Sequence, residues 1–164
     1  MKRAVLNLLI CALPLCASAA PLPQWVLVAK DGPDADEVTL HLGSAKSINV
    51  LTCAPDYKKG GHWVTVTFHA KRDMHLQQTG HTARVMTPLT IASGAVTFTI
   101  PAEEDTNFDQ GGTDAVSDDI SPKAPVLAAF ARTGLLKRSA LGETSSDPPV
   151  PIDKAAKFVR LCGG

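Results

Sequence analysis

The chain has 164 residues, of which 16 are basic and 16 are acidic, and 45% of its residues are apolar. This composition excludes a disordered tail, a collagen-like fibre, a long coiled coil and a polytopic membrane protein, and it is typical of one globular domain. The net charge of zero also argues against a nucleic-acid-binding protein, which usually carries a strong basic excess.

The first nineteen residues have the three parts of a secretory signal peptide. Lys2 and Arg3 form the charged start, residues 4–16 form the apolar stretch, and Ala17-Ser18-Ala19 supplies the small residues of a cleavage site. We expect cleavage after Ala19, because a later cut would leave Pro21 as the first residue of the mature chain, where proline is unfavourable. The mature protein would then be one domain of residues 20–164, periplasmic or secreted.

Two alternative readings of the N-terminus are disfavoured. A membrane anchor needs about twenty uninterrupted apolar residues, and Asn7 and Pro14 lie within a run that is already shorter. A lipid anchor on Cys16 would need a small residue before it, where Leu15 stands. We therefore expect no membrane span after cleavage.

Cleavage would change both the charge and the cysteine count. Lys2 and Arg3 would be lost, which leaves 14 basic and 16 acidic residues, and only Cys53 and Cys162 would remain as cysteines. An oxidising compartment favours a disulfide between these two. The alternative is two unpaired thiols. A catalytic dithiol is disfavoured because no C-x-x-C spacing occurs.

The first half of the chain alternates apolar and polar residues with a period of two, which indicates half-buried strands. Thr39 and His41 alternate with three aliphatic residues, and Thr65 and Thr67 alternate with another apolar set. The strands expected in chain order cover residues 25–30, 38–42, 46–53, 64–68 and 84–87, followed by a hairpin over 90–100 that turns at Ser93-Gly94.

Helices are expected only towards the C-terminus. Residues 103–119 are acidic and contain few apolar side chains, so we expect a surface loop there. A helix should begin at Ser121-Pro122 or Ala124-Pro125 and end at Gly134. A strand over residues 135–142 should follow. A last helix, with Asp153 as its N-cap, should end near Cys162.

These elements predict a mostly β (α+β) fold. It would be an antiparallel β-sandwich or open barrel of about six to eight strands, with two C-terminal helices and one disulfide.

The order of the elements resembles a group of uncharacterised one-disulfide envelope proteins of Gram-negative bacteria. The resemblance rests on the tryptophan strand at Trp25, the strand of residues 50–53 that ends in a cysteine, the helix of residues 125–134 and the closing residues 157–162. It covers most of the mature chain. It implies a periplasmic location and a bridge between Cys53 and Cys162, and it implies no catalytic residue.

Histidines are the first candidate metal ligands, and an envelope protein could use imidazoles to bind copper or zinc. His69, His75 and His81 could meet if the chain between them folds back. His62 lies seven residues before His69, so on one strand the two point to opposite faces. The alternative is that all five histidines, including His41, lie on solvated polar faces.

An acidic segment is the second candidate. Asp105, Asn107 and Asp109 alternate oxygen ligands as calcium loops do. An EF-hand would also need glycine where Gln110 stands and glutamate where Val116 stands. The segment therefore predicts either a weak calcium site or an acidic surface loop.

Trp63 shares its predicted strand face with Thr65, Thr67 and His69, which would form an amphipathic binding patch. The alternative is a tryptophan covered by the C-terminal helix. Catalytic motifs such as G-x-S-x-G, H-E-x-x-H and the phosphate-binding loop are absent from the sequence.

The sequence as a whole predicts a non-enzymatic binding or envelope-interaction module without a cofactor. Its partner would be an envelope protein, a glycan or a small ligand, and not a nucleic acid. A metal-binding periplasmic protein is the alternative function, and an unrecognised hydrolase is the third.

Overall fold

The computed structural model describes residues 24–29, 37–43, 49–55, 61–71, 85–106, 111–145 and 147–164. In these residues nine strands form one antiparallel sheet in the order β1-β2-β3-β4-β7-β6-β5-β8-β9, together with two helices. The elements are β1 (Trp25–Ala29), β2 (Val38–Leu42), β3 (Asn49–Pro55), β4 (His62–Ala70), β5 (Met86–Ser93), β6 (Val96–Thr106), β7 (Thr113–Ile120), α1 (Pro125–Thr133), β8 (Lys137–Ala140), β9 (Glu143–Thr144) and α2 (Ile152–Leu161).

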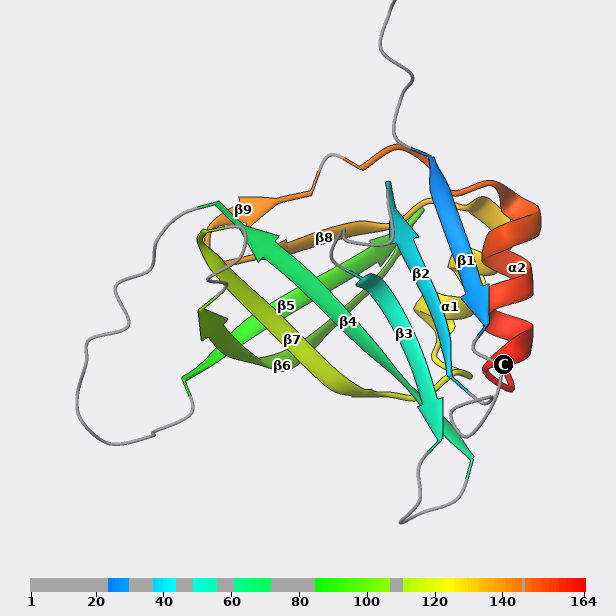
Figure 1. The fold of residues 1–164 in the computed structure, drawn as a ribbon, viewed down its shortest axis with the longest axis horizontal. Helices are drawn as coiled ribbons and strands as arrows, with labels where there is room; N and C mark the ends of the chain where they lie inside the picture. The colour runs from blue at the N-terminus through cyan, green and yellow to red at the C-terminus, as the bar shows by residue number, and fades with distance from the viewer. Residues whose placement is uncertain are drawn as a thin grey trace, which may run out of the picture.

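The sheet is strongly curved into a half-barrel, and the helices close its open side (Figure 1). Helix α1 packs against α2, β5 and β6, and α2 packs against β2. Phe130 of α1 and Phe158 of α2 are fully buried in the same core as the sheet residues. The mostly β prediction is therefore confirmed, and its open-barrel form is the correct one because a single sheet surrounds the core.

Strand register separates a concave apolar face from a convex polar face. In the β3–β4 ladder Leu51 lies opposite Val66, and Cys53 lies opposite Val64, and all four side chains are buried. Thr52 and its partner lie between these pairs and point the other way. The alternation in the sequence thus predicted correctly which side of these strands forms the core.

The acidic segment expected to be a loop is mostly strand. Strand β6 extends to Thr106, and β7 occupies Thr113–Ile120, with Asp105 opposite Asp114. The expectation was wrong because the buried positions here hold small side chains, such as Ala102 and Ala115. Backbone pairing between long strands stabilises a segment whose side chains give little hydrophobic signal.

Other boundaries also differ from expectation. The β5–β6 turn is Gly94-Ala95, one residue later than expected, and β5 is continuous from Met86. Of the two possible starts for α1, the one at Pro125 is correct. The N-cap of α2 is Pro151, and Asp153 lies in the first turn, where a carboxylate still favours the helix dipole. Among the described helices, none is long and apolar enough to span a membrane.

Two prolines face each other inside the sheet, at Pro88 of β5 and Pro101 of β6. Glu104 donates its backbone N–H to the Val85 carbonyl oxygen at 2.9 Å. Hydrogen-bonded and non-hydrogen-bonded residue pairs alternate along an antiparallel ladder, so Pro88 and Pro101 form a non-hydrogen-bonded pair. Each proline nitrogen then points away from the other strand. Ladder pairing with β8 begins only at Thr90, so the missing donor of Pro88 breaks no bond in the sheet.

We expect Gly134→Ala to destabilise the fold more than Gly94→Ala. Both glycines have a positive φ, at 64° and 58°, so alanine is strained at either site by about 1–2 kcal/mol. At position 134 a Cβ atom would also lie 2.0 Å from the Val150 carbonyl oxygen, whereas nothing lies within 4 Å at position 94. Urea denaturation should show an additional loss of about 2 kcal/mol for Gly134→Ala. Equal losses in the two variants would contradict the close contact with Val150.

Candidate functional site

Four side chains of β4 form a row on the convex face of the sheet. Trp63, Thr65, Thr67 and His69 are half-buried, and the residues between them are buried on the concave side. With a rise of about 3.3 Å per residue, this row is about 20 Å long. The expected patch of these four residues therefore lies on one face, and we call it the convex row.

Helix α2 lies on the other side of the sheet from Trp63. The Cys162 thiol at the end of α2 hydrogen-bonds to Cys53, and the cross-strand partner of Cys53 is Val64 on the concave face. Trp63 is the neighbour of Val64 in the strand and points the opposite way. The alternative that the C-terminal helix covers Trp63 is therefore wrong.

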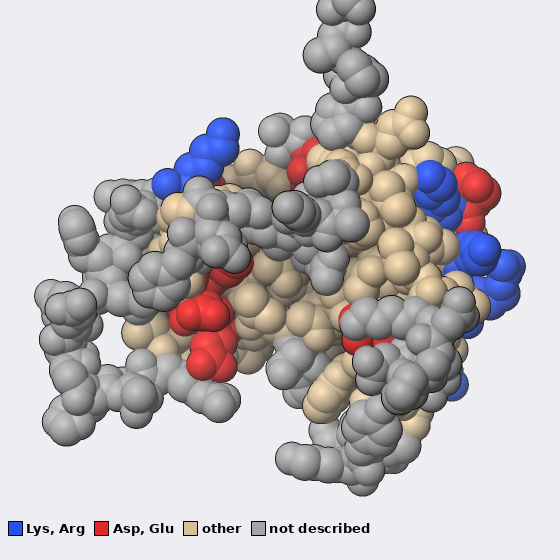
Figure 2. Space-filling model, in the orientation of Figure 1, with Lys and Arg blue, Asp and Glu red and all other residues tan. Residues whose placement is uncertain are grey.

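An imidazole–carboxylate pair lies at one end of the convex row. Nδ1 of His69 is 2.7 Å from Oδ1 of Asp114, its partner in the β4–β7 ladder. With Nδ1 donating to this carboxylate, a neutral His69 presents Nε2 as an acceptor. Asp105 lies opposite Asp114 in the next ladder. Acidic side chains gather over this end of the sheet and basic ones over α2 (Figure 2).

The predicted metal ligands are only partly described. Of the histidine set, His69 is described, and His75 and His81 lie outside the described residues, as do Asn107 and Asp109 of the acidic set. Across the described ranges, no group of three or more histidine, cysteine, aspartate or glutamate side chains could hold a metal ion. Both metal sites thus stay predictions.

The other two histidines lie apart from His69. His62 occupies the opposite face of β4, as its spacing predicted, and His41 is buried in β2. Nδ1 of His41 has no hydrogen-bond partner among the described residues. The structure therefore brings neither of them to the convex row.

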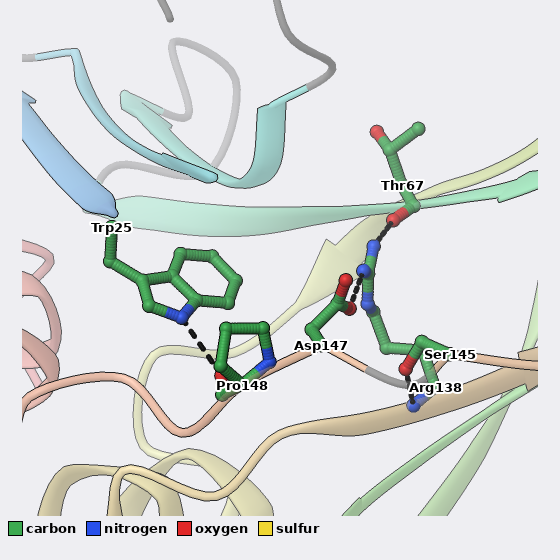
Figure 3. Close-up of polar contacts among 6 residues, drawn as sticks. All are labelled: Trp25, Thr67, Arg138, Ser145, Asp147 and Pro148. Carbon is green, nitrogen blue, oxygen red and sulfur yellow. Dashed lines mark hydrogen bonds and ion pairs between the residues drawn. The ribbon is translucent and has the colours of Figure 1, made fainter. Parts of the chain in front are cut away.

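A buried arginine lies inside the half-barrel, where sequence reasoning did not expect it (Figure 3). Arg138 of β8 is 5% exposed, and its guanidinium donates hydrogen bonds to the Thr67 carbonyl oxygen and to the Asp147 carboxylate. It also lies 6.0 Å from the centre of the Phe68 ring. Burial lowers the pKa of Arg138 from its ordinary value, while the Asp147 carboxylate acts in the opposite direction. Arginine nevertheless stays charged.

The chain after β9 connects this arginine to the first strand of the sheet. Trp25 Nε1 donates to the Pro148 carbonyl oxygen at 2.8 Å, and Lys154 Nζ donates to the Trp25 carbonyl oxygen at 2.6 Å. Pro148 directly follows Asp147, so Arg138 and Trp25 bind adjacent residues of one segment. We call Arg138, Asp147, Pro148 and Trp25 the closing clamp, because they join β1, at one end of the strand order, to β8, the last strand but one at the other end.

The two cysteines of the mature chain are neighbours in the core. Cys53 and Cys162 are 0% and 1% exposed, and both are free thiols in this structure. The hydrogen bond to Cys53, followed by burial, raises the pKa of the Cys162 thiol well above its ordinary value. This thiol therefore stays protonated in the folded protein and is a poor nucleophile. The structure brings the expected pair together without forming the bond.

Comparison of the chain with protein-family models, curated proteins and solved structures gave no match.

We expect Asp147→Ala to destabilise the protein by about 3 kcal/mol, at the low end for a broken buried pair because Asp147 is itself partly exposed. The variant leaves the buried Arg138 guanidinium without its counter-charge. The double variant Arg138→Met with Asp147→Ala should recover part of this loss, because it removes the charge as well. Urea denaturation measures the free energies of unfolding of the wild type, Arg138→Met, Asp147→Ala and the double variant.

Arg132→Met is the matched control, because Arg132 is exposed on α1 and should change stability by about 0.5 kcal/mol or less. If the losses from Arg138→Met alone and Asp147→Ala alone add up in the double variant, the ion pair does not stabilise the clamp.

Proposed function

We propose that this chain is a non-enzymatic binding module of the periplasm or the secreted fraction, exported by a signal peptide that is cleaved after Ala19. Support for the location comes from the charged start, the apolar stretch and the small residues of the first nineteen positions. The resemblance to one-disulfide envelope proteins agrees with this location.

The convex row is the observation that carries the binding proposal. It offers one indole ring, two threonine hydroxyls and an imidazole held by a carboxylate, in a line along β4. The concave side of the same strand is filled by core residues. A ligand of β4 would therefore lie along the convex face.

The chemistry of the convex row favours a glycan over the other two partner classes. Sugar rings have apolar faces that stack on an aromatic ring, and their hydroxyl groups bond to threonine, imidazole and carboxylate groups. The row has a single large apolar side chain, whereas the centre of a protein interface needs a larger apolar area. A linear row of about 20 Å also suits an extended chain better than a compact small ligand. We propose an envelope polysaccharide as the ligand.

We expect the purified protein to co-sediment with peptidoglycan sacculi and to bind a β-1,4-linked N-acetylglucosamine tetrasaccharide. Trp63→Ala should weaken binding of the tetrasaccharide about tenfold, because the stacking surface is lost. Thr65→Val keeps the side-chain shape and removes one hydroxyl, so it should weaken binding by a smaller factor. Calorimetric titration gives the dissociation constants.

Lys157→Ala is the control, because Lys157 is exposed on α2, on the other side of the sheet from the row. The glycan proposal fails if the protein binds neither sacculi nor the tetrasaccharide. It also fails if Trp63→Ala binds both as tightly as the wild type does.

We also propose that Cys53 and Cys162 form a disulfide in the exported protein. The support is that the two thiols are in contact and that oxidising compartments favour such pairs. The sulfur–sulfur bond forms as the two thiols lose two protons and two electrons to the disulfide of an oxidant protein. It would tie the end of α2 to β3. Since both sulfurs are buried, the bond should form before α2 has packed.

We expect protein purified from the periplasm to have no thiol that iodoacetamide can alkylate after unfolding. Reduction should lower the free energy of unfolding by about 2–4 kcal/mol, because the unfolded chain regains the freedom that the bridge removed. The Cys53→Ala, Cys162→Ala double variant is the control, and its stability should not respond to the reductant. Two alkylatable thiols in the periplasmic protein would contradict the bridge.

A further inference from the structure

We infer that a cleft beside β8 binds the C-terminal end of an extended peptide. Two segments border it, residues 134–138 on one side and Ser145 with residues 147–150 on the other. The Ser145 N–H donates to the Arg138 carbonyl oxygen at 2.8 Å, and the Val150 N–H donates to the Gly134 carbonyl oxygen at 2.8 Å. Between these two bonds the segments separate.

The separation leaves a cleft of about 340 Å³, which is at the small end of the range for ligand cavities. Neither β4 nor the convex row contributes to its lining, so the site is independent of the proposed glycan surface. The lining includes Leu135, Leu136, Lys137, Ser145, Asp147 and Pro149.

The backbone N–H and C=O of Leu136 face this cleft, and neither bonds to another described residue. Lys137 pairs with Ala92 of β5, whereas Gly134 and Arg138 bond to the opposite segment. Successive residues of an extended chain direct their backbone groups to opposite sides. The N–H and C=O of Leu136 therefore point to the opposite segment, as those of Arg138 do. Within the described ranges, neither group has a hydrogen-bond partner, although Leu136 is only 8% exposed.

An unpaired peptide group at a nearly buried residue favours a ligand that can satisfy it. Leaving a nearly buried peptide group without a hydrogen bond is unfavourable, and a second peptide group offers the matching acceptor and donor. Extended peptides bind in this way when they add to an unpaired strand edge. The backbone of Leu136 therefore points to a peptide as the occupant.

The side chains around the cleft define which end of a peptide would bind. Leu135 is 45% exposed, and with Pro149 it provides an apolar wall for one aliphatic side chain. Lys137 is exposed and forms no ion pair with any described residue, whereas the charge of Asp147 is balanced by Arg138. The uncompensated ammonium group favours a carboxylate, so we assign the cleft to a peptide that ends there.

The test uses the purified protein and an N-acetylated Ala-Leu-Leu tripeptide, prepared with a free C-terminal carboxylate and as the C-terminal amide. Amide NMR shifts of the protein report binding at each residue. We expect saturable shifts centred on Leu136 and Lys137, and roughly threefold weaker binding of the amide form. Lys137→Gln should weaken binding of the carboxylate form by the same factor and leave the amide form unchanged.

Leu135→Ser should weaken both forms, because it removes the apolar wall without changing charge. Lys157→Gln on α2 is the matched control and should bind both forms as the wild type does. Melting curves confirm that each variant is folded. The inference is overturned if no saturable shift occurs at Leu136, or if the two peptide forms bind equally well. The convex-row proposal would survive either outcome.

Discussion

The guanidinium of Arg138 crosses the concave side of the sheet from β8 to the Thr67 carbonyl oxygen on β4, two strands that are not neighbours in the sheet. Burying a charge in this position is costly unless it is paired and hydrogen-bonded. Asp147 supplies the counter-charge, and the next residue, Pro148, accepts a hydrogen bond from Trp25. A single polar network thus holds the curvature that would otherwise depend on apolar packing alone.

The candidate binding surfaces follow from this curvature. Closing the concave side around a packed core leaves the convex side of β4 to carry Trp63 and His69. The cleft lies where the chain after β9 runs back beside β8, with Asp147 bound to Arg138 and Pro148 to Trp25. Asp147 belongs both to the clamp and to the cleft lining. The thiol pair is at the other end of the core, where α2 ends against β3. The thiol pair and the clamp therefore join different parts of the same half-barrel.

The strands that alternate large apolar and polar side chains were predictable, because this alternation indicates a strand with one buried face. Strand β4 and its convex row are the clearest example. The acidic strands were not predictable, because Ala102, Ala115 and Ser117 bury little apolar area and their pairing depends on distant partners. Arg138 was missed for a related reason. A charged residue next to Lys137 suggests an exposed strand. Only the position of Arg138 on the same strand face as Leu136 and Ala140, two residues to either side, indicated an inward direction.

The sequence by itself determined the mostly β class, the two C-terminal helices, the polar face of β4 and the two cysteines that remain after the expected cleavage. These are local properties, set by periodicity, helix caps and counting. Tertiary structure decided that there is one curved sheet instead of two, that Cys53 and Cys162 touch, and that Arg138, Asp147 and Trp25 form a clamp. Such contacts join residues far apart in the chain, and only the packed core can bring them within reach of one another.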